Sequence, residues 1–205
     1  QAAWNKARAI LETLPRAWRV RAVLSDCGKA ALYGSTDRGA DAAFLDSLAG
    51  TAESDLERYI FAFYAGRLYA RSLGEPSAQK APMRARARFT EAMKYAPTGG
   101  DFDAALWYLV DLAMKEGSEA AGASAALDEL EAWLPSAHDP RFFADSIENL
   151  TVTFVRTAQW KALIRLQKLL PAGIDAEIRT RLAYITARSG LLSPDERRLA
   201  FEEAF

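Results

Sequence analysis

The sequence contains little reactive chemistry: among 205 residues it has one cysteine, Cys27, and one histidine, His138. A single cysteine excludes an internal disulfide framework and a cysteine-based zinc site. His138 precedes Asp139 and Pro140 between two predicted helices, where no nucleophile or metal ligand is marked nearby. These surroundings predict a loop or capping role for His138 and a buried, inert thiol for Cys27.

The chain also lacks a strong net charge and a long apolar segment. Its 26 basic and 27 acidic side chains give a formal net charge of -1, so no overall field attracts it to nucleic acid or anionic lipid. Uninterrupted apolar runs are much shorter than the ~20 residues of a membrane-spanning helix. No metal-ligand spacing, phosphate-binding loop or dinucleotide-binding glycine pattern occurs. We therefore predict no nucleic-acid partner, no membrane span, no metal and no cofactor.

Half of the residues are hydrophobic, which is enough for a sizeable core, and their spacing is helical. Segments of about 12 to 18 residues rich in Ala, Leu, Arg and Glu alternate with breaks of Gly, Pro, Ser and Asp. The β-branched run from Thr151 to Val155 lies within a longer helical pattern that starts after Pro140. The sequence thus predicts an all-α protein.

One spacing recurs along the chain: a small residue, a large apolar residue four positions on, a small or apolar residue after three more, and a proline after five more. It is clearest at Ala85, Phe89, Ala92 and Pro97. Further copies occur at Ala3, Ala7, Ile10 and Pro15; at Ala40, Phe44, Ser47 and Ala52, without the proline; at Ala123, Leu127, Leu130 and Pro135; and at Gln159, Leu163, Leu166 and Pro171. The second positions are 37, 45, 38 and 36 residues apart, which is close to one helical hairpin per step.

This spacing resembles the second helix of a tetratricopeptide repeat, and Gly66 with Tyr69 resembles the small residue and tyrosine of the first helix. Ala183 and Gly190 repeat the small-residue and hairpin-glycine positions. The resemblance implies a right-handed α-solenoid of about four antiparallel helical hairpins, a single array over residues 1–205. The sequence departs from the pattern with a long connection after Tyr69, through Gly74, Pro76 and Ser77.

Both ends of the chain are predicted to lie within a hairpin. Residues 1–15 match a second helix without its first, and residues 199–205 match a second helix without its stop. A solenoid needs polar capping helices, whereas the sequence ends on Phe205. We therefore expect a fragment of a longer protein, or an end that packs on another surface, including that of a second copy.

In an array of this kind the first helices line the concave surface, so their polar and aromatic residues are the candidates for a binding groove. The resemblance places nine residues there. They are Phe63, Arg67 and Arg71 in one hairpin, Trp107, Tyr108 and Asp111 in the next, and Thr180, Tyr184 and Arg188 near the C-terminus. Aromatic residues beside arginines suit recognition of peptides or glycans, and core packing is the alternative for each aromatic.

These features predict a non-enzymatic module that binds or scaffolds a protein or peptide partner. Glu53 and Ser54 are similar to the Glu–Ser pair of lytic transglycosylases, but the glycine- and glutamine-bearing segment of those enzymes is missing, and both residues fit a helix start. The alternative is the non-catalytic helical region of such an enzyme, which segments 105–109 and 181–185 resemble. The array would then meet peptidoglycan in the periplasm or cell envelope, and a cytoplasmic location is the alternative.

Overall fold

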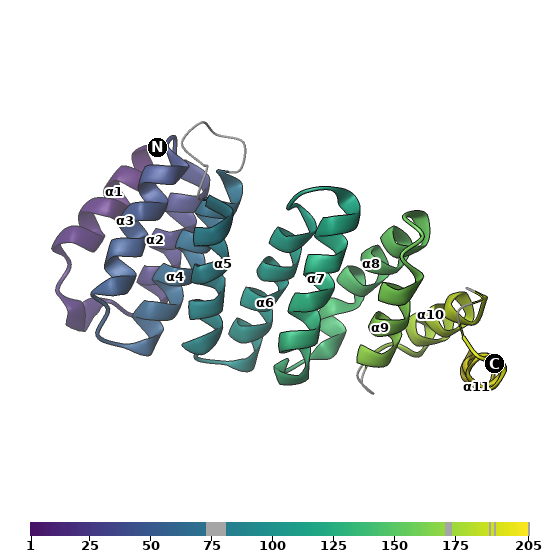
Figure 1. Ribbon diagram of the computed structural model, residues 1–205. Coiled ribbons are helices and arrows are strands. Elements are labelled where there is room, and N and C mark those ends of the chain that lie inside the picture. The colour runs from purple at the N-terminus through teal and green to yellow at the C-terminus, as the bar shows by residue number, and fades with distance from the viewer. Residues whose placement is uncertain (73–80, 171–173, 189, 191, 205) are drawn as a thin grey trace. The chain divides into compact units, whose positions relative to one another are not determined.

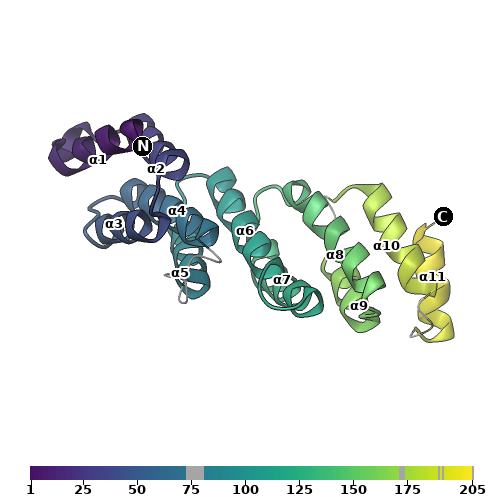
Figure 2. The same ribbon diagram turned by 90° about the horizontal axis from the view of Figure 1, so that it is seen from above.

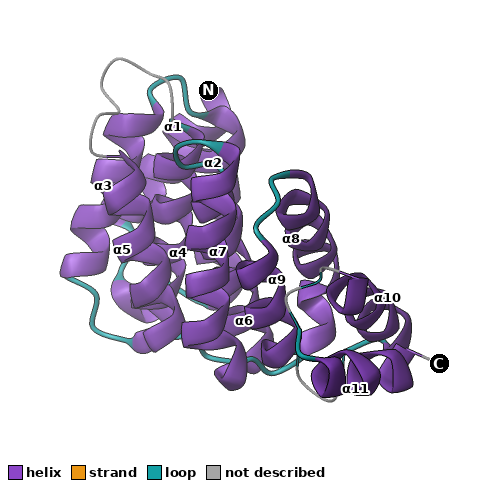
Figure 3. Ribbon diagram, turned by 45° about the vertical axis from the view of Figure 1, so that its right-hand side comes forward, coloured by secondary structure: helices purple, strands orange, loops and turns teal. Residues whose placement is uncertain are grey.

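The computed structural model describes residues 1–72, 81–170, 174–188, 190 and 192–204, and these residues form helices and loops without a strand (Figures 1 and 3). The all-α prediction is therefore confirmed, and the β-branched run from Thr151 to Val155 lies inside a helix. No described helix is long and apolar enough to cross a membrane. The predicted positions Gly74, Pro76, Ser77, Pro171 and Phe205 lie outside the described residues.

The chain divides into two compact units, which we call the N-terminal unit (Gln1–Leu112) and the C-terminal unit (Ala113–Phe205). The helices of the first are α1 (Ala2–Thr13), α2 (Arg21–Gly34), α3 (Arg38–Gly50), α4 (Asp55–Arg71), α5 (Ala81–Lys94) and α6 (Gly99–Met114), whose last turn crosses the boundary. Those of the second are α7 (Glu119–Trp133), α8 (Ala144–Arg156), α9 (Trp160–Leu169), α10 (Ala176–Arg188) and α11 (Pro194–Ala204). Short 3-10 helices occupy Arg16–Trp18, Leu134–Ser136 and Pro140–Phe143.

Each unit is built from helices that pack mainly on their neighbours in the chain. In the N-terminal unit α1 packs on α2, α2 on α4, and α4 on both α3 and α5 (Figure 2). In the C-terminal unit α7 packs on α8, α8 on α9, α9 on α10 and α10 on α11, and the pairs α7–α9 and α8–α10 also touch. Alternate helices thus contact each other as well as their sequence neighbours, which is consistent with a stack of helical hairpins.

The recurring apolar positions of the sequence are central to this packing. Phe89 in α5, Leu127 in α7 and Leu163 in α9 are each fully buried. Phe44, in the copy without a proline, is only half-buried in α3. The strong copies of the pattern therefore mark helices that bury a large side chain, as predicted.

Glycine allows two of the close helix contacts. A Cβ atom added to Gly66 of α4 would lie 2.9 Å from the Phe89 ring of α5. A Cβ atom added to Gly28 of α2 would lie 2.2 Å from the Tyr64 ring of α4. Both distances are shorter than a van der Waals contact, so at these positions the backbone of one helix packs directly on an aromatic ring of another.

Polar side chains at the helix starts satisfy backbone N–H groups that lack a partner within the helix. Asp37 caps α3, Ser54 caps α4 and Ser118 caps α7, each by accepting a hydrogen bond from a backbone N–H three residues on. The connection after α10 contains Gly190, whose φ is +75°, a value that favours glycine. Gly190 thus lies between two helices that pack on each other, which is consistent with its predicted hairpin position.

Candidate functional site

A groove lies between α8 and α10 in the C-terminal unit. Its volume is about 290 Å³, and most of its wall is apolar. Its lining residues are Glu148, Thr151, Val152, Val155 and Arg156 from α8, and Ile178, Arg181, Leu182 and Ile185 from α10. Because α8 and α10 pack directly on each other, the groove is formed entirely within one compact unit.

Helix α8 forms a wall of the groove because it has two apolar faces. Ile147, Leu150 and Phe154 point into the core, and each is 0% exposed. Val152 and Val155 lie three positions apart on another face, and they are 57% and 37% exposed. These two valines leave apolar surface in contact with water beside α10, and covering it would be favourable.

Helix α10 supplies the opposite wall. Ile178, Leu182 and Ile185 follow the i, i+4, i+7 spacing that places residues on one helix face. Leu182 is buried, whereas Ile178 and Ile185 are half-buried. Leu182 therefore closes the bottom of the groove, and the two isoleucines remain accessible on either side of it.

Charged residues border the apolar wall. Arg181 of α10 forms ion pairs with Glu148 of α8 and with Glu177, whose Oε1 lies 3.1 Å from Arg181 Nη2. Arg156 at the end of α8 pairs with Glu119 of α7. These side chains are exposed, so their pairs contribute little to stability. At a binding surface they instead favour correctly oriented partners, because like charges on a partner would be repelled.

Four of the predicted groove residues come together in the N-terminal unit. Arg67 Cζ lies 4.6 Å from the centre of the Tyr108 ring and 5.5 Å from that of Phe63. The rings of Phe63 and Tyr108 meet edge to face at 5.5 Å, and Trp107 meets Tyr108 in the same way at 5.0 Å. Phe63 is buried, whereas Arg67, Trp107 and Tyr108 are half-buried. The structure thus places an arginine within an aromatic cluster that spans α4 and α6.

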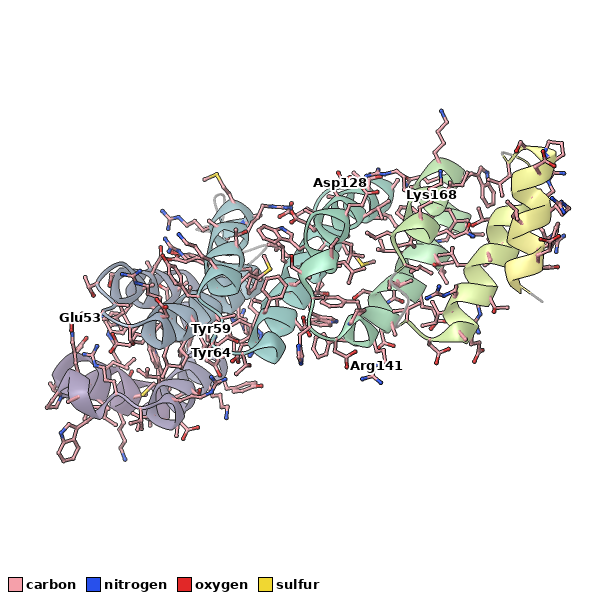
Figure 4. The ribbon with its side chains drawn as sticks, turned by 90° about the horizontal axis from the view of Figure 1, so that it is seen from below. Glu53, Tyr59, Tyr64, Asp128, Arg141 and Lys168 are labelled. Atoms are coloured by element: carbon pink, nitrogen blue, oxygen red, sulfur yellow. The ribbon has the colours of Figure 1, made fainter. Side chains whose placement is uncertain are left out.

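Tyr64 extends this cluster toward α2. Tyr64 belongs to α4, as does Tyr59 (Figure 4), and its ring meets that of Phe63 edge to face at 5.5 Å. Burial raises the pKa of the Tyr64 phenol, which the nearby Arg67 charge partly offsets. The phenol is therefore a neutral hydrogen-bond donor at physiological pH.

Arg71 and Asp111 lie outside the cluster. Arg71 is exposed at the end of α4, where Nη1 donates a hydrogen bond to the Leu32 carbonyl oxygen at 3.2 Å and Cζ lies 5.5 Å from the Tyr33 ring centre. Asp111 is half-buried on α6, one turn beyond Tyr108. The structure does not test whether either residue meets a partner, so both stay predictions.

The three predicted residues on α10 flank the groove rather than line it. Tyr184 packs edge to face on Phe201 of α11 at 6.2 Å. Arg188 Nη1 donates a hydrogen bond to the Tyr184 hydroxyl at 3.1 Å. Thr180 is half-buried between two lining residues, Ile178 and Arg181. Thr180, Tyr184 and Arg188 also stay predictions, because no contact with a partner is observed.

Sequence reasoning missed the apolar groove residues. The repeat register selected polar and aromatic positions of the first helices, and Val152 and Val155 belonged to a run that was interpreted only as helix. The sequence did contain a signal, because α8 has apolar residues on a second face, in addition to the one face that a core-facing helix needs. That excess would have identified α8 as a helix with a second contact surface.

The residues considered for catalysis have structural roles. Ser54 Oγ accepts a hydrogen bond from the Glu57 N–H as the N-cap of α4, and Glu57 Oε2 accepts one from the Glu53 N–H just before that cap. Burial raises the pKa of the Cys27 thiol, with a further contribution from Asp26, so the reactive thiolate form is disfavoured. No group of three or more His, Cys, Asp or Glu side chains suited to a metal ion occurs among the described residues.

Comparisons with known proteins do not assign a family. No family model matches the chain, and neither the search of curated proteins nor that of solved structures gave a match. The fold defines the class only, as an all-helical protein whose helices pack in consecutive pairs.

Proposed function

We propose that this chain is a non-enzymatic module that binds a peptide segment of a partner protein in the groove between α8 and α10. The observation that supports the proposal most strongly is the exposed pair Val152 and Val155 opposite Ile178 and Ile185. Two apolar walls with a gap between them can bury side chains of a ligand, and burial of apolar surface is the main driving force of association.

The dimensions of the groove favour side chains of a peptide over a whole small molecule. Its volume of about 290 Å³ is at the lower limit of small-molecule sites, which enclose ~300–1,000 Å³. A peptide that inserts two or three apolar side chains and leaves its backbone in water fits this space. The ion pairs of Arg181 and Arg156 would flank such a peptide and set its orientation.

We also propose a more specific fold than the packing of consecutive helices alone. We propose that the hairpins form a right-handed, tetratricopeptide-like α-solenoid, in which the even-numbered helices line the concave surface. The contact between α8 and α10 supports this arrangement, because neighbouring first helices touch in such a stack.

The proposal is tested by selecting binders from a library of short random peptides and measuring their affinity by titration calorimetry. We expect selected peptides with several apolar residues. The substitutions Val152→Asp and Val155→Asp should each weaken their binding at least tenfold, since a charge in the apolar wall loses solvation when the groove is occupied. Thermal unfolding should confirm that both variants remain folded, because both side chains are exposed.

Leu199→Asp is the matched control, because Leu199 is 54% exposed on α11 and does not line the groove. It should leave affinity unchanged. Binders that respond to Leu199→Asp but not to Val152→Asp would refute the proposal. Muropeptides test the alternative of a peptidoglycan-contacting helical region, and binding of muropeptides instead of apolar peptides would favour it.

A further inference from the structure

Arg67 is held in the N-terminal unit by aromatic contacts. Its Cζ atom lies 4.6 Å from the ring centre of Tyr108, 5.5 Å from that of Phe63 and 5.8 Å from that of Tyr64. Cation–π attraction keeps the guanidinium among these rings, and the stem of the side chain packs against them. The position of the charge is therefore fixed before any ligand arrives.

This guanidinium lacks a polar partner. Its Nε–H is buried and has no acceptor, and no hydrogen bond or ion pair joins Arg67 to another of the residues that the structure describes. Nearby arginines differ, because Arg58 and Arg71 donate to backbone carbonyl oxygens and Arg88 pairs with Asp46. A half-buried cation without an acceptor has lost part of its hydration without a replacement, so an added acceptor would be favourable.

The tyrosines around Arg67 add further donors. Tyr64 and Tyr108 both lie against the guanidinium, since Arg67 Cζ is 5.8 Å and 4.6 Å from their ring centres, so two phenols flank it. Burial keeps the Tyr64 phenol protonated. A guanidinium has only donors, and protonated phenols can donate as well. The complementary group is one that has only acceptors, which is an anion.

The geometry of the guanidinium favours a carboxylate as that anion. A carboxylate has one charge and two oxygens in the geometry of the guanidinium edge. We propose that Arg67, with the phenols of Tyr64 and Tyr108, binds a carboxylate group of an acidic peptide. This inference uses none of the residues of the α8–α10 groove and stands independently of it.

The test follows the side-chain Nε–H resonance of Arg67 in the ¹⁵N-labelled protein during titration with N-acetyl-glutamyl-glutamate. A carboxylate that binds the guanidinium should shift this resonance saturably, while the resonance of Arg84 stays in place. Arg84 is the matched reference because its Cζ also lies over a tyrosine ring, 5.6 Å from the centre of Tyr69, but its Nη1 already donates to the Tyr69 hydroxyl.

Two analogues of the peptide identify the source of the carboxylate. The C-terminal amide of N-acetyl-glutamyl-glutamate keeps only side-chain carboxylates, and N-acetyl-glutaminyl-glutamine keeps only the terminal one. The analogue that retains the bound group should retain the shift, and the fully neutral N-acetyl-glutaminyl-glutaminamide should produce none. Arg67→Gln should weaken binding at least tenfold, Arg67→Lys should weaken it less, and Arg84→Gln should leave it unchanged.

The wild-type titration keeps the proposal falsifiable even where Arg67→Gln does not fold. An unchanged Arg67 resonance would overturn it, as would an equal shift with the neutral peptide. Tighter binding of inorganic phosphate than of N-acetyl-glutamyl-glutamate would also contradict it. Failure of this titration would not affect the proposal that the apolar groove binds a peptide, because that proposal is tested at Val152 and Val155.

Discussion

At the scale of single residues, Asp101 shows how one residue, through its side chain and its backbone carbonyl, joins three helices of the N-terminal unit. Its Oδ1 accepts a hydrogen bond from Arg21 Nη2 of α2 at 2.6 Å, and its Oδ2 accepts one from Thr98 Oγ1 at 2.7 Å. Its backbone carbonyl oxygen accepts one from the Tyr59 hydroxyl of α4 at 3.4 Å. Burial raises the pKa of the Asp101 carboxyl, but the bonds from Arg21 and Thr98 outweigh that effect, so the pKa lies below its ordinary value.

We expect Asp101→Asn to lower the free energy of unfolding at pH 7 by about 1.5–3 kcal/mol, the usual contribution of hydrogen bonds to a charged group. A carboxyl whose pKa is lowered by folding stabilises the protein above its unfolded pKa of about 3.9, and this stabilisation is lost as the pH falls through the folded pKa. The difference between the variant and the wild type, measured by urea denaturation, should therefore shrink below about pH 4.

Asp26→Asn serves as the control for this series, because the Asp26 side chain is 77% exposed and, among the described residues, pairs only with Lys29, at 3.6 Å. It should change stability by less than about 0.5 kcal/mol at every pH. A deficit of Asp101→Asn that persisted unchanged in acid would show that its carboxylate charge is not what joins the helices.

Ala158 offers a residue whose replacement should stabilise the protein. It follows α8 with φ at +55°, and the Gln159 N–H bonds back to the Phe154 carbonyl oxygen at 2.8 Å, as at a helix end that usually contains glycine. Ala158→Gly should raise the free energy of unfolding by about 0.5–1 kcal/mol, because glycine adopts positive φ without steric cost. Ala132→Gly, within α7, should lower it by about the same amount, and a loss at both positions would contradict this account.

At the scale of helices, the repeat pattern of the sequence corresponds to the contact between α4 and α5. Phe89 was identified from the recurring spacing and Gly66 from the resemblance to a tetratricopeptide repeat, and in the structure the Phe89 ring packs against the backbone at Gly66. A small residue opposite a large one allows two helices to approach closely. The spacing is therefore a packing requirement between adjacent helices.

Gly66→Ala should test this requirement. The new Cβ atom would lie 2.9 Å from a Phe89 ring that is fully buried, so the ring or a helix must move. We expect a loss of about 1–3 kcal/mol in the free energy of unfolding, the usual effect of overpacking. Gly50→Ala is the control, because no atom lies within 4 Å of its added Cβ, and it should be neutral or slightly stabilising. Equal effects at Gly50 and Gly66 would argue against a specific contact.

The same scale explains what the sequence could and could not predict. Helical spacing fixes which residues of one helix face the core, so the buried positions Phe89, Leu127 and Leu163 were predictable. Spacing within one helix does not reveal which exposed residues of two different helices meet. Val152 of α8 and Ile185 of α10 line one groove only because those helices pack side by side, and this contact depends on the tertiary structure.

For the aromatic cluster the sequence was more informative. Phe63 and Arg67 lie four positions apart on α4, so one helical turn brings them together. Their contact with Tyr108 depends on the packing of α6, which the repeat register approximated. That Arg67 would lack a polar partner could not be predicted, because it depends on every acceptor within reach.

At the scale of the whole molecule, the two compact units carry different surfaces. The N-terminal unit presents the half-buried Arg67 with its aromatic neighbours, and the C-terminal unit presents the apolar groove of α8 and α10. The proposed function is therefore the binding of partners by surfaces that a helical framework presents.

The most direct test of the proposed function is methyl NMR of the protein labelled at Ile, Leu and Val, with and without a selected apolar peptide. Binding in the groove should shift the methyl signals of Val152, Val155, Ile178 and Ile185 and leave those of Leu127 and Leu163 unchanged, because the latter are fully buried elsewhere in the same unit. Signals of the four groove residues that stay in place while the peptide binds would contradict the proposal.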